Sequence, residues 1–401
     1  MRKTTYLCVM MLLSMNMMAQ IDLNDSNWRR TFYDDFTVTG RSWHNWQSYP
    51  DKKWMGYPGS GVTTTGGFQV YQYSNCIFSP NDGTMKLVGE YCDTICRNTY
   101  PLPGWMHGNY PPCDNLFYFS GGIDARRDSI IGDTLGFRYG FFEIRCKLPK
   151  NPGTHTAFWL HGADTAITDP YYEEIDIFEY SWSFGDPEVH YHPVNNPHPT
   201  FAGDPRVYTL AVCHNQHGDS INFDTDVYGM KYIRIPSEQE DIGGWHTYSC
   251  EWLPDHVFWY LDGNLVSAYF DQTHIPRHPI TLKTSYAINH YAVEAIKDST
   301  NHVIGYEPDW MGSDTLTIDY VRVYQLEWDC DTEEVIASQN DLDQYEYAVK
   351  KSVTIAPPST GIAIGNTDKV TFRATNFMKA AGPFEVQSGG EFTVIMQECP
   401  D

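Results

Sequence analysis

Positive charge is scarce in this sequence. Its 401 residues contain 27 Lys and Arg against 51 Asp and Glu, so the formal net charge at pH 7 is -24. Because phosphate groups are bound by a basic face, this balance disfavours nucleic acid and anionic membranes as partners. The acidic excess is typical of a solvated surface that keeps an exported protein soluble.

Hydrophobic runs long enough to span a membrane are also missing. The one marked apolar run extends from Tyr6 to Met18, follows the basic residues Arg2 and Lys3, and ends before a small residue. This order is typical of a signal peptide, so we predict that residues 1–19 are removed. The cysteine of this region lies inside the run, so no lipoprotein motif is evident. We therefore expect a soluble protein that is secreted or periplasmic, without a transmembrane span.

Helical periodicity is absent over long stretches. From about residue 29 to 325, short runs of alternating apolar and polar residues are separated by Gly, Pro, Asn and Asp. The run GFFEIRCKL alternates in this way, and Asp262-Gly263 marks a hairpin turn. The pattern predicts an all-β protein, a sandwich or a barrel. Two long segments, about 91–120 and 185–240, interrupt it, and loops of such length usually carry function.

The length exceeds what one compact core usually serves, so we predict more than one unit. After Gln325 the sequence turns acidic, and strand patterns resume only near residue 347. We predict a large β domain at 20–327, a linker at 328–345, and a small C-terminal β module of unknown role at 346–401.

Nine of the ten cysteines remain after removal of the signal peptide, in a compartment that permits disulfides. The candidates for pairing are the two that bracket the C-terminal stretch and the three in one insertion: Cys330, Cys399, Cys92, Cys96 and Cys113. Cys146 and Cys250 lie in apolar strand patterns, where we expect them to be buried. No pair of cysteines and no group of Cys and His has the spacing of a zinc site.

The segment EEIDIFEY places three acids in a strand-like context. Glu174 and Asp176 are two residues apart, so they share one face of a strand. Glu179 would fall on the opposite face of a regular strand. One extra residue, a β-bulge at Ile177 and Phe178, would return Glu179 to the face of the other two acids.

With the bulge, the two glutamates would lie about four strand steps apart, which leaves roughly 5 Å between carboxyl groups that lean together. A retaining glycosidase requires this separation. In that scheme Glu174 attacks the anomeric carbon, and Glu179 protonates the leaving oxygen and later activates water. Asp176 would orient the nucleophile, and its charge would help keep the acid protonated. From the residues alone two alternatives stay open, a solvated strand face and an oxygen-rich cation site.

The acids and their flanks resemble glycoside hydrolase family 16. They match the E-x-D-x-x-E signature of that family in its bulged form. The flanking segments YGFFEIRCKLPKNPGTHTAFWL, WHTYSCEWLPDHVFWYLDGNLV and LTIDYVRVYQ follow the family's order. The resemblance implies a β-jelly-roll sandwich with a concave substrate cleft. It also implies endo-cleavage of β-1,3 or β-1,4 linkages in a β-glucan or β-galactan, with Glu174, Asp176 and Glu179 as nucleophile, assisting acid and acid/base.

Further residues are weaker candidates for sugar contacts. Some match family positions that face the cleft, and others are tryptophans in or near loops that could stack on sugar rings: Trp159, His190, Asn75, Arg127, Trp182, Trp105 and Trp310. Each could instead have a packing or structural role. The resemblance implies no catalytic cofactor. It implies a structural calcium on the convex face, with Asp319 and Asp35 as candidate ligands.

Three positions depart from the family pattern. His155 and Thr156 stand where glucanase members often have Trp-Pro, and Glu173 stands where Gly is frequent. These departures weaken an assignment to laminarinase-like or lichenase-like members and leave the chemistry unchanged.

We expect a monomer that acts on a polysaccharide, with β-1,3-glucan, mixed-linkage glucan, agar-type galactan and mucin-type galactose linkages all open as substrates. The alternative is a carbohydrate-binding protein without catalysis on the same sandwich. A third interpretation assigns attachment to a surface or glycan to the C-terminal module, which resembles small terminal β domains of secreted bacterial carbohydrate enzymes.

Overall fold

The computed structural model describes residues 27–39, 54–56, 69–92, 117–125, 136–151, 153–162, 171–181, 207–216, 231–234, 244–270, 272, 275–288, 292–345, 347–357 and 361–400. Strands dominate this part of the chain. The only α-helix that the described residues form is α2 (Gln339–Asp343), and none of their helices is long and apolar enough to cross a membrane.

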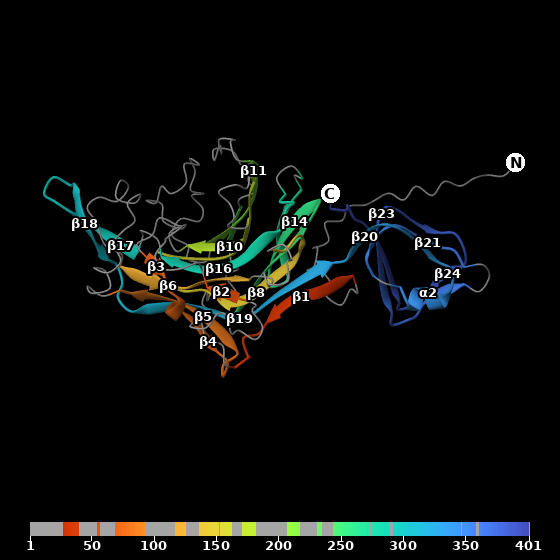
Figure 1. Cartoon of the computed structure of the whole chain (residues 1–401), viewed down its shortest axis with the longest axis horizontal. Coiled ribbons are helices and arrows are strands. Elements are labelled where there is room, and N and C mark those ends of the chain that lie inside the picture. Colours follow the sequence, from red (N-terminus) through yellow and green to blue (C-terminus); the bar gives the residue numbers. More distant parts are fainter. Residues whose placement is uncertain are drawn as a thin grey trace.

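Two large sheets form the body of the protein. Within the described residues the first sheet has ten strands, in the order β15 (Asn264–Tyr269), β14 (His256–Leu261), β13 (His246–Leu253), β8 (Gly140–Lys147), β19 (Ser313–Leu326), β5 (Thr84–Tyr91), β6 (Tyr118–Ser120) and β3 (Gln69–Tyr71), with β1 (Trp28–Asp34) on β19 and β4 (Cys76–Ser79) on β5. The second has seven strands in the same part of the chain, in the order β12 (Lys231–Arg234), β11 (Val207–Gln216), β10 (Tyr171–Ser181), β9 (Thr154–Gly162), β16 (Ile280–Ile288), β7 (Gly122–Ala125) and β2 (Trp54–Gly56). The sheets lie one on the other as two layers (Figure 1).

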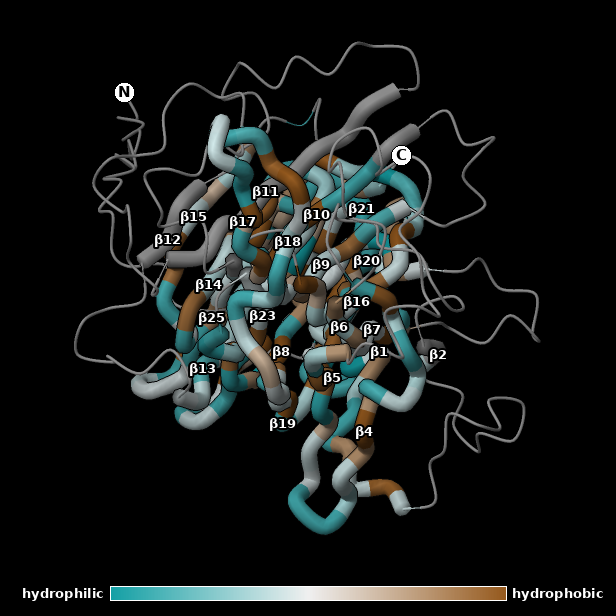
Figure 2. The backbone as a smooth tube through the Cα atoms, turned by 90° about the vertical axis from the view of Figure 1, so that its left-hand side faces the viewer, coloured by the Kyte–Doolittle hydropathy of each residue, from teal (hydrophilic) through white to brown (hydrophobic). Residues whose placement is uncertain are grey.

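The core lies between these two layers. Apolar side chains from both sheets belong to one buried cluster, and in it the rings of Phe178 and Tyr248 lie 4.5 Å apart between centroids. Brown and teal segments alternate along the strands of both sheets, as expected where one strand face packs and the other faces outward (Figure 2). The predicted all-β architecture is confirmed, and of the two alternatives the sandwich is the correct one.

Strand β8 shows how far its alternation decides burial. Phe142, Ile144 and Cys146 face the core, as their period of two predicts. Glu143 points the other way and is nevertheless fully buried, because Arg322 pairs with its carboxylate and the Tyr320 hydroxyl donates a hydrogen bond of 2.9 Å to it. The polar face of this strand is therefore covered by side chains of β19.

A shorter hairpin and a separate C-terminal unit complete the described structure. β17 (Val293–Lys297) and β18 (Val303–Pro308) form the hairpin at one end of the molecule, and the C-terminal unit lies at the other end (Figure 1). That unit contains one sheet of parallel strands, β20 (Trp328–Ile336), β21 (Val349–Ile355), β23 (Lys369–Ala380) and β25 (Glu391–Met396), and a second parallel pair, β22 (Ile362–Ile364) and β24 (Phe384–Val386). It has its own buried cluster, which includes Ile336 and Phe372.

The predicted linker at 328–345 is wrong as to its structure. Strand β20 and helix α2 fill this segment, and β20 pairs in parallel with β21. The many acids there suggested a solvated connection, but Lys350 is buried and pairs with Asp329 at 2.6 Å and with Glu334 at 3.6 Å. The acidic stretch is thus the first strand of the C-terminal sheet.

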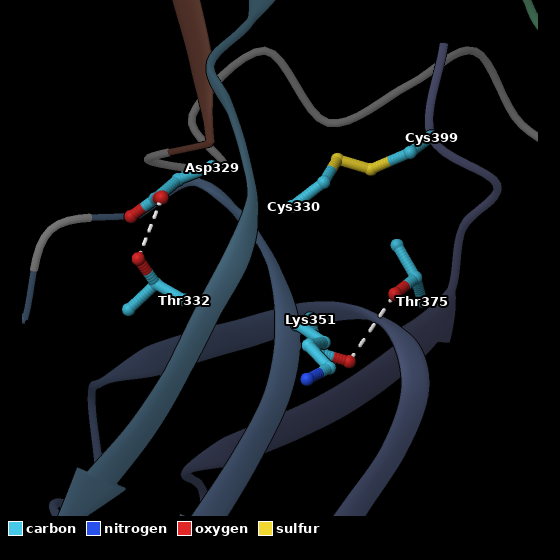
Figure 3. Close-up of a disulfide and its surroundings, with 6 residues drawn as sticks. All are labelled: Asp329, Cys330, Thr332, Lys351, Thr375 and Cys399. Carbon is cyan, nitrogen blue, oxygen red and sulfur yellow. Dashed lines mark hydrogen bonds between the residues drawn. A yellow bond between two sulfur atoms is a disulfide. The ribbon is translucent and has the colours of Figure 1, made fainter. Parts of the chain in front are cut away.

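The cysteines follow the predicted division. Cys330 and Cys399, two of the five pairing candidates, form a disulfide with each other between β20 and the chain after β25 (Figure 3). Cys146 and Cys250 are buried and free, as expected. Cys92 is buried, and Cys96 and Cys113 lie outside the described residues.

Candidate active site

Strand β10 carries the three acids and contains the predicted bulge. Against β9, Asp176 is opposite Trp159 and Phe178 is opposite Phe158, so one residue of β10 has no counterpart. Against β11, the register shifts between Asp176 and Glu179. Ile177 is therefore the extra residue against β9, and against β11 the two residues Ile177 and Phe178 stand opposite a single position.

The bulge brings the acids to one face of the seven-stranded sheet. Ile175, Ile177 and Phe178 are all buried in the core, and two of them follow each other directly. Because two successive side chains point inward at the bulge, Glu179 returns to the face that Glu174 and Asp176 occupy. We call this face the outer face, since the core lies on the opposite side.

Asp176 lies between the two glutamates and is 6% exposed. Burial, followed by the charges of Glu179 and Glu174 and a hydrogen bond with Glu174, holds the pKa of Asp176 well above its usual range. The protonated form of Asp176 is therefore favoured, and in that form the hydroxyl donates to Glu174. The sequence predicts that the charge of Asp176 keeps Glu179 protonated; in the structure burial, more than the neighbouring carboxylates, favours an uncharged Asp176.

A histidine from the neighbouring strand contacts Glu179. His155 on β9 places Nε2 3.1 Å from Oε1 of Glu179, and both side chains are partly open to solvent. The sequence marked His155 only as a departure from the family pattern. Its role as a partner of Glu179 follows from the register, because Ser181 pairs with His155 and Glu179 pairs with Ala157 on the same strand.

Trp159 lies on the outer face beside the acids and is half-buried. Lys283 of β16 pairs with Trp159 in the sheet and places its ammonium 5.6 Å from the centre of the indole ring. The same ammonium lies 3.6 Å from Oδ2 of Asp124 on β7. Both partners of this ion pair are buried, so a charged row crosses the sheet next to the three acids. The sequence signal for this ion pair is the lysine in the strand ITLKTSYAI, all of whose residues are buried.

Glu173 points to the other side of β10 and has a structural role. It is buried and accepts hydrogen bonds from the backbone N–H groups of Arg277 and His278, both at 3.0 Å. Its carboxylate thereby fixes the segment that leads into β16. The glutamate that stands here in place of Gly thus holds the segment before β16 by two hydrogen bonds.

The remaining candidates for sugar contacts fare differently. Asn75 is buried, and its amide donates to the Val88 carbonyl and to Glu90, which gives it a structural role; its sugar contact stays a prediction. Trp310 is half-buried and packs on Tyr118, with 4.6 Å between ring centres. Four candidates lie outside the described residues: His190, Arg127, Trp182 and Trp105.

The candidate calcium ligands do not form a cation site in the described part of the chain. The carboxylate of Asp319 pairs with the guanidinium of Arg145, a cation that would repel Ca²⁺. Asp35 is half-buried and accepts hydrogen bonds from the backbone and hydroxyl of Thr37. Among the described residues no three acids, histidines or cysteines are grouped as metal ligands. The structural calcium stays a prediction that these two residues do not support.

Comparison with known proteins supports the resemblance to a family. The model of the family "Glycosyl hydrolases family 16" matches residues 214–321. An endo-1,3-1,4-beta-glycanase, EglC, of Rhizobium meliloti (strain 1021) is 22% identical over 313 residues, which are 75% of this chain and 52% of that protein. A beta-glucanase of Rhodothermus marinus is 30% identical over 133 residues, which are 32% of this chain and 36% of that protein. Residues 214–321 are thus similar to glycosyl hydrolase family 16, the family that the sequence resembles.

A solved structure supports the family 16 fold. SCLam, described as a non-specific endo-beta-1,3(4)-glucanase from family GH16, superposes with a TM-score of 0.50 at 20% identity, over 78% of this chain and 94% of that one. The likeness confirms the predicted jelly-roll sandwich and concerns the fold alone. The chain spans about half or less of the length of these two curated relatives.

Proposed function

We propose that this protein is a retaining glycoside hydrolase that cleaves internal β-linkages of a polysaccharide. One observation carries the proposal: the bulge at Ile177 gathers Glu174, Asp176 and Glu179 on the outer face of the seven-stranded sheet. The match of residues 214–321 to the model of family 16 and the similarity to an endo-glycanase and a beta-glucanase support the reaction class.

The three acids can divide the chemistry between them. Glu174 attacks the anomeric carbon and forms a glycosyl ester, while Glu179 protonates the departing oxygen. Glu179 then accepts a proton from water, which displaces the sugar from Glu174 with a second inversion. His155 holds the Glu179 carboxyl through Oε1, so that the carboxyl keeps one orientation in both steps.

Asp176 supports the nucleophile. Its hydroxyl donates to the carboxylate of Glu174 and orients it toward the sugar. When Glu174 becomes an ester its charge disappears, which removes one of the causes that raise the pKa of Asp176. The proton of Asp176 is thus held most tightly while Glu174 is free to attack.

The position of Trp159 suggests a sugar platform beside the acids. Its ring lies on the outer face in register with Asp176, and the ammonium of Lys283 contacts it from the next strand. A sugar ring stacked on Trp159 would therefore lie one strand away from the reacting carboxyls. The polysaccharide itself stays open among β-glucans, galactans and mucin-type glycans.

We also infer export through the predicted signal peptide at 1–19, which lies outside the described residues. We likewise propose a boundary between a catalytic domain and the C-terminal unit. It is supported by the second buried cluster, all of whose residues lie in the C-terminal unit.

A panel of polymers tests the proposed function. The protein is incubated with β-1,3-glucan, mixed-linkage glucan, agarose and mucin glycans, and products are sized. We expect oligosaccharides from one of them, with the anomeric configuration of the substrate retained in the first product seen by NMR. Glu174→Gln and Glu179→Gln should each lose at least about 10³-fold in kcat, because each removes a group that takes part in bond breaking.

Two controls sharpen this test. Glu294→Gln changes an exposed glutamate of β17 away from the site and should keep full activity. With an activated aryl glycoside, azide should restore turnover of Glu174→Ala as a glycosyl azide of opposite configuration. An inverted product from the wild type would exclude double displacement, and tight binding without any product would establish the alternative of a carbohydrate-binding protein.

A further inference from the structure

A tryptophan from the opposite sheet is bonded to the bulge. Trp259 lies on β14 of the ten-stranded sheet and is 1% exposed. Its indole Nε1–H donates a hydrogen bond of 2.9 Å to the backbone carbonyl of Asp176 on β10. The bond crosses the core and joins the two layers at the residue that precedes Ile177.

The location of this bond is informative because the ladder is broken there. Ile177 has no counterpart on β9 or β11, so the backbone near it is held by fewer regular contacts than the rest of β10. A buried carbonyl at such a point needs a donor, and a buried indole N–H needs an acceptor. The two groups satisfy each other.

The opposite sheet is irregular at the same point. Trp259 pairs with Ser267 while the next residue, Tyr260, pairs with Leu265, so β15 has its own extra residue beside Trp259. This second bulge lies against the strand that carries the indole. Irregularities of both layers therefore meet at the hydrogen bond between Trp259 and Asp176.

We propose that Trp259 is a positioning residue for the acids of β10, which rests on the proposed function of those acids. By holding the Asp176 carbonyl, the indole fixes the backbone of the bulge and with it the direction of the Asp176 and Glu179 side chains. Trp259 reaches no substrate, because it lies on the core side of the sheet. It acts only through the strand that it holds.

The chain offers a matched control. Trp252 on β13 is also fully buried, and its Nε1–H donates a bond of 3.0 Å to the carbonyl of Pro276, which is not on β10. Trp252→Phe and Trp259→Phe each keep an aromatic ring and remove one buried indole hydrogen bond. If tryptophan acts only by packing, the two variants behave alike.

The kinetic test compares these two variants of the full chain on one polymer. For Trp259→Phe we expect kcat to fall about 10- to 100-fold with KM within about twofold, because a misplaced carboxyl weakens the transition state more than ground-state binding. The pH profile of kcat should also change shape, since the spacing of the coupled acids changes. Trp252→Phe should keep kcat within about twofold and the wild-type profile.

A second measurement needs no turnover. Hydrogen exchange followed by mass spectrometry should show faster exchange in peptides that cover 176–179 for Trp259→Phe, and unchanged exchange there for Trp252→Phe. Unchanged exchange at the bulge, or equal kcat for the two variants, would overturn the positioning role. If the wild type has no turnover on any polymer, the proposed function fails while the exchange experiment still decides whether Trp259 holds the bulge.

Discussion

Asp176 shows at the scale of one residue how a site of this kind opposes stability. Its side chain is buried between two other acids, which raises its pKa, so the folded state binds a proton that the unfolded chain releases at a lower pH. Above the unfolded pKa, near 3.9, unfolding therefore becomes easier as the pH rises, until the folded pKa is passed. Sites that perform chemistry often carry such a cost.

Replacing Asp176 should expose this cost. Asp176→Asn keeps the shape and can still donate to Glu174, but it needs no bound proton. We expect a higher Tm than that of the wild type at pH 8, by about 2 °C or more, and a smaller difference at pH 4. Calorimetry at both pH values measures this. A variant that is less stable at pH 8 would show that the Asp176 carboxyl is not held protonated against its solution preference.

His256 provides the opposite case at the same scale. Burial by itself would lower its pKa, but the hydrogen bond with Asp255 and the carboxylate of Glu251 outweigh burial and raise the pKa of His256 to about 9. The contacts are short, with Nδ1 2.9 Å from Asp255 and Nε2 3.6 Å from Glu251. The charged imidazole therefore stabilises the fold wherever it is protonated.

This stabilisation should depend on pH in a defined window. It is fully present below the unfolded pKa of about 6.5 and is lost as the pH rises through about 9, with a total on the order of 3 kcal/mol. We expect the free energy of unfolding of the wild type to fall more between pH 6.5 and 9.5 than that of His256→Gln. Urea titrations at both pH values give the change in the free energy of unfolding with pH for each protein. An equal change in the wild type and in His256→Gln would contradict a raised pKa of His256.

At the scale of elements, the bulge in β10 is the feature that the sequence predicted best. Three acids among apolar residues required an extra residue to share a face, and the register contains that residue at Ile177. The interactions that hold the strand were beyond prediction. Trp259 lies 83 residues from Asp176, and no local pattern tells which buried indole meets which carbonyl. The linker predicted at 328–345 was wrong for the same reason. Lys350, which pairs with Asp329 of this acidic stretch, lies on another strand.

Changing the length of the bulge should have unequal effects. Removing Ile177 leaves Asp176 and Phe178 adjacent, as their partners Trp159 and Phe158 already are, so Glu179 stays on the outer face. We expect measurable activity and a loss of about 2–4 kcal/mol from the missing buried side chain. Inserting one alanine after Ile177 instead turns Glu179 toward the core, which should abolish activity and lower Tm further.

Activity assays and thermal melts of the two variants decide this. Glu294→Gln serves again as the control for handling. Equal activity of the deletion and the insertion would contradict the idea that the single extra residue sets the face of Glu179.

At the scale of the whole molecule, the C-terminal unit is attached by contacts as well as by the chain. Asn27, just before β1, donates a bond of 2.9 Å to the Thr371 carbonyl. Gln397 donates a bond of 3.2 Å to Asp255, the same carboxylate that holds His256. Val349 of β21 is buried in the core cluster of the sandwich. The sandwich and the C-terminal unit thus share polar contacts and part of one core.

Removing the unit should therefore destabilise the sandwich. A chain that ends at Glu327 loses the cover over the core near Val349 and the bond to Asp255, and we expect its Tm to fall by at least about 5 °C. The full chain with Cys330→Ser and Cys399→Ser is the milder comparison. It keeps every other contact and loses only the cross-link over a sequence separation of 69 residues, which is worth about 4 kcal/mol.

Turnover and polysaccharide pull-down, measured separately at 25 °C, distinguish a unit that supports the fold from one that attaches the protein to a glycan. Retained turnover with lost pull-down would assign glycan attachment to the unit, and an unchanged Tm for the truncated chain would show that its contacts do not stabilise the sandwich.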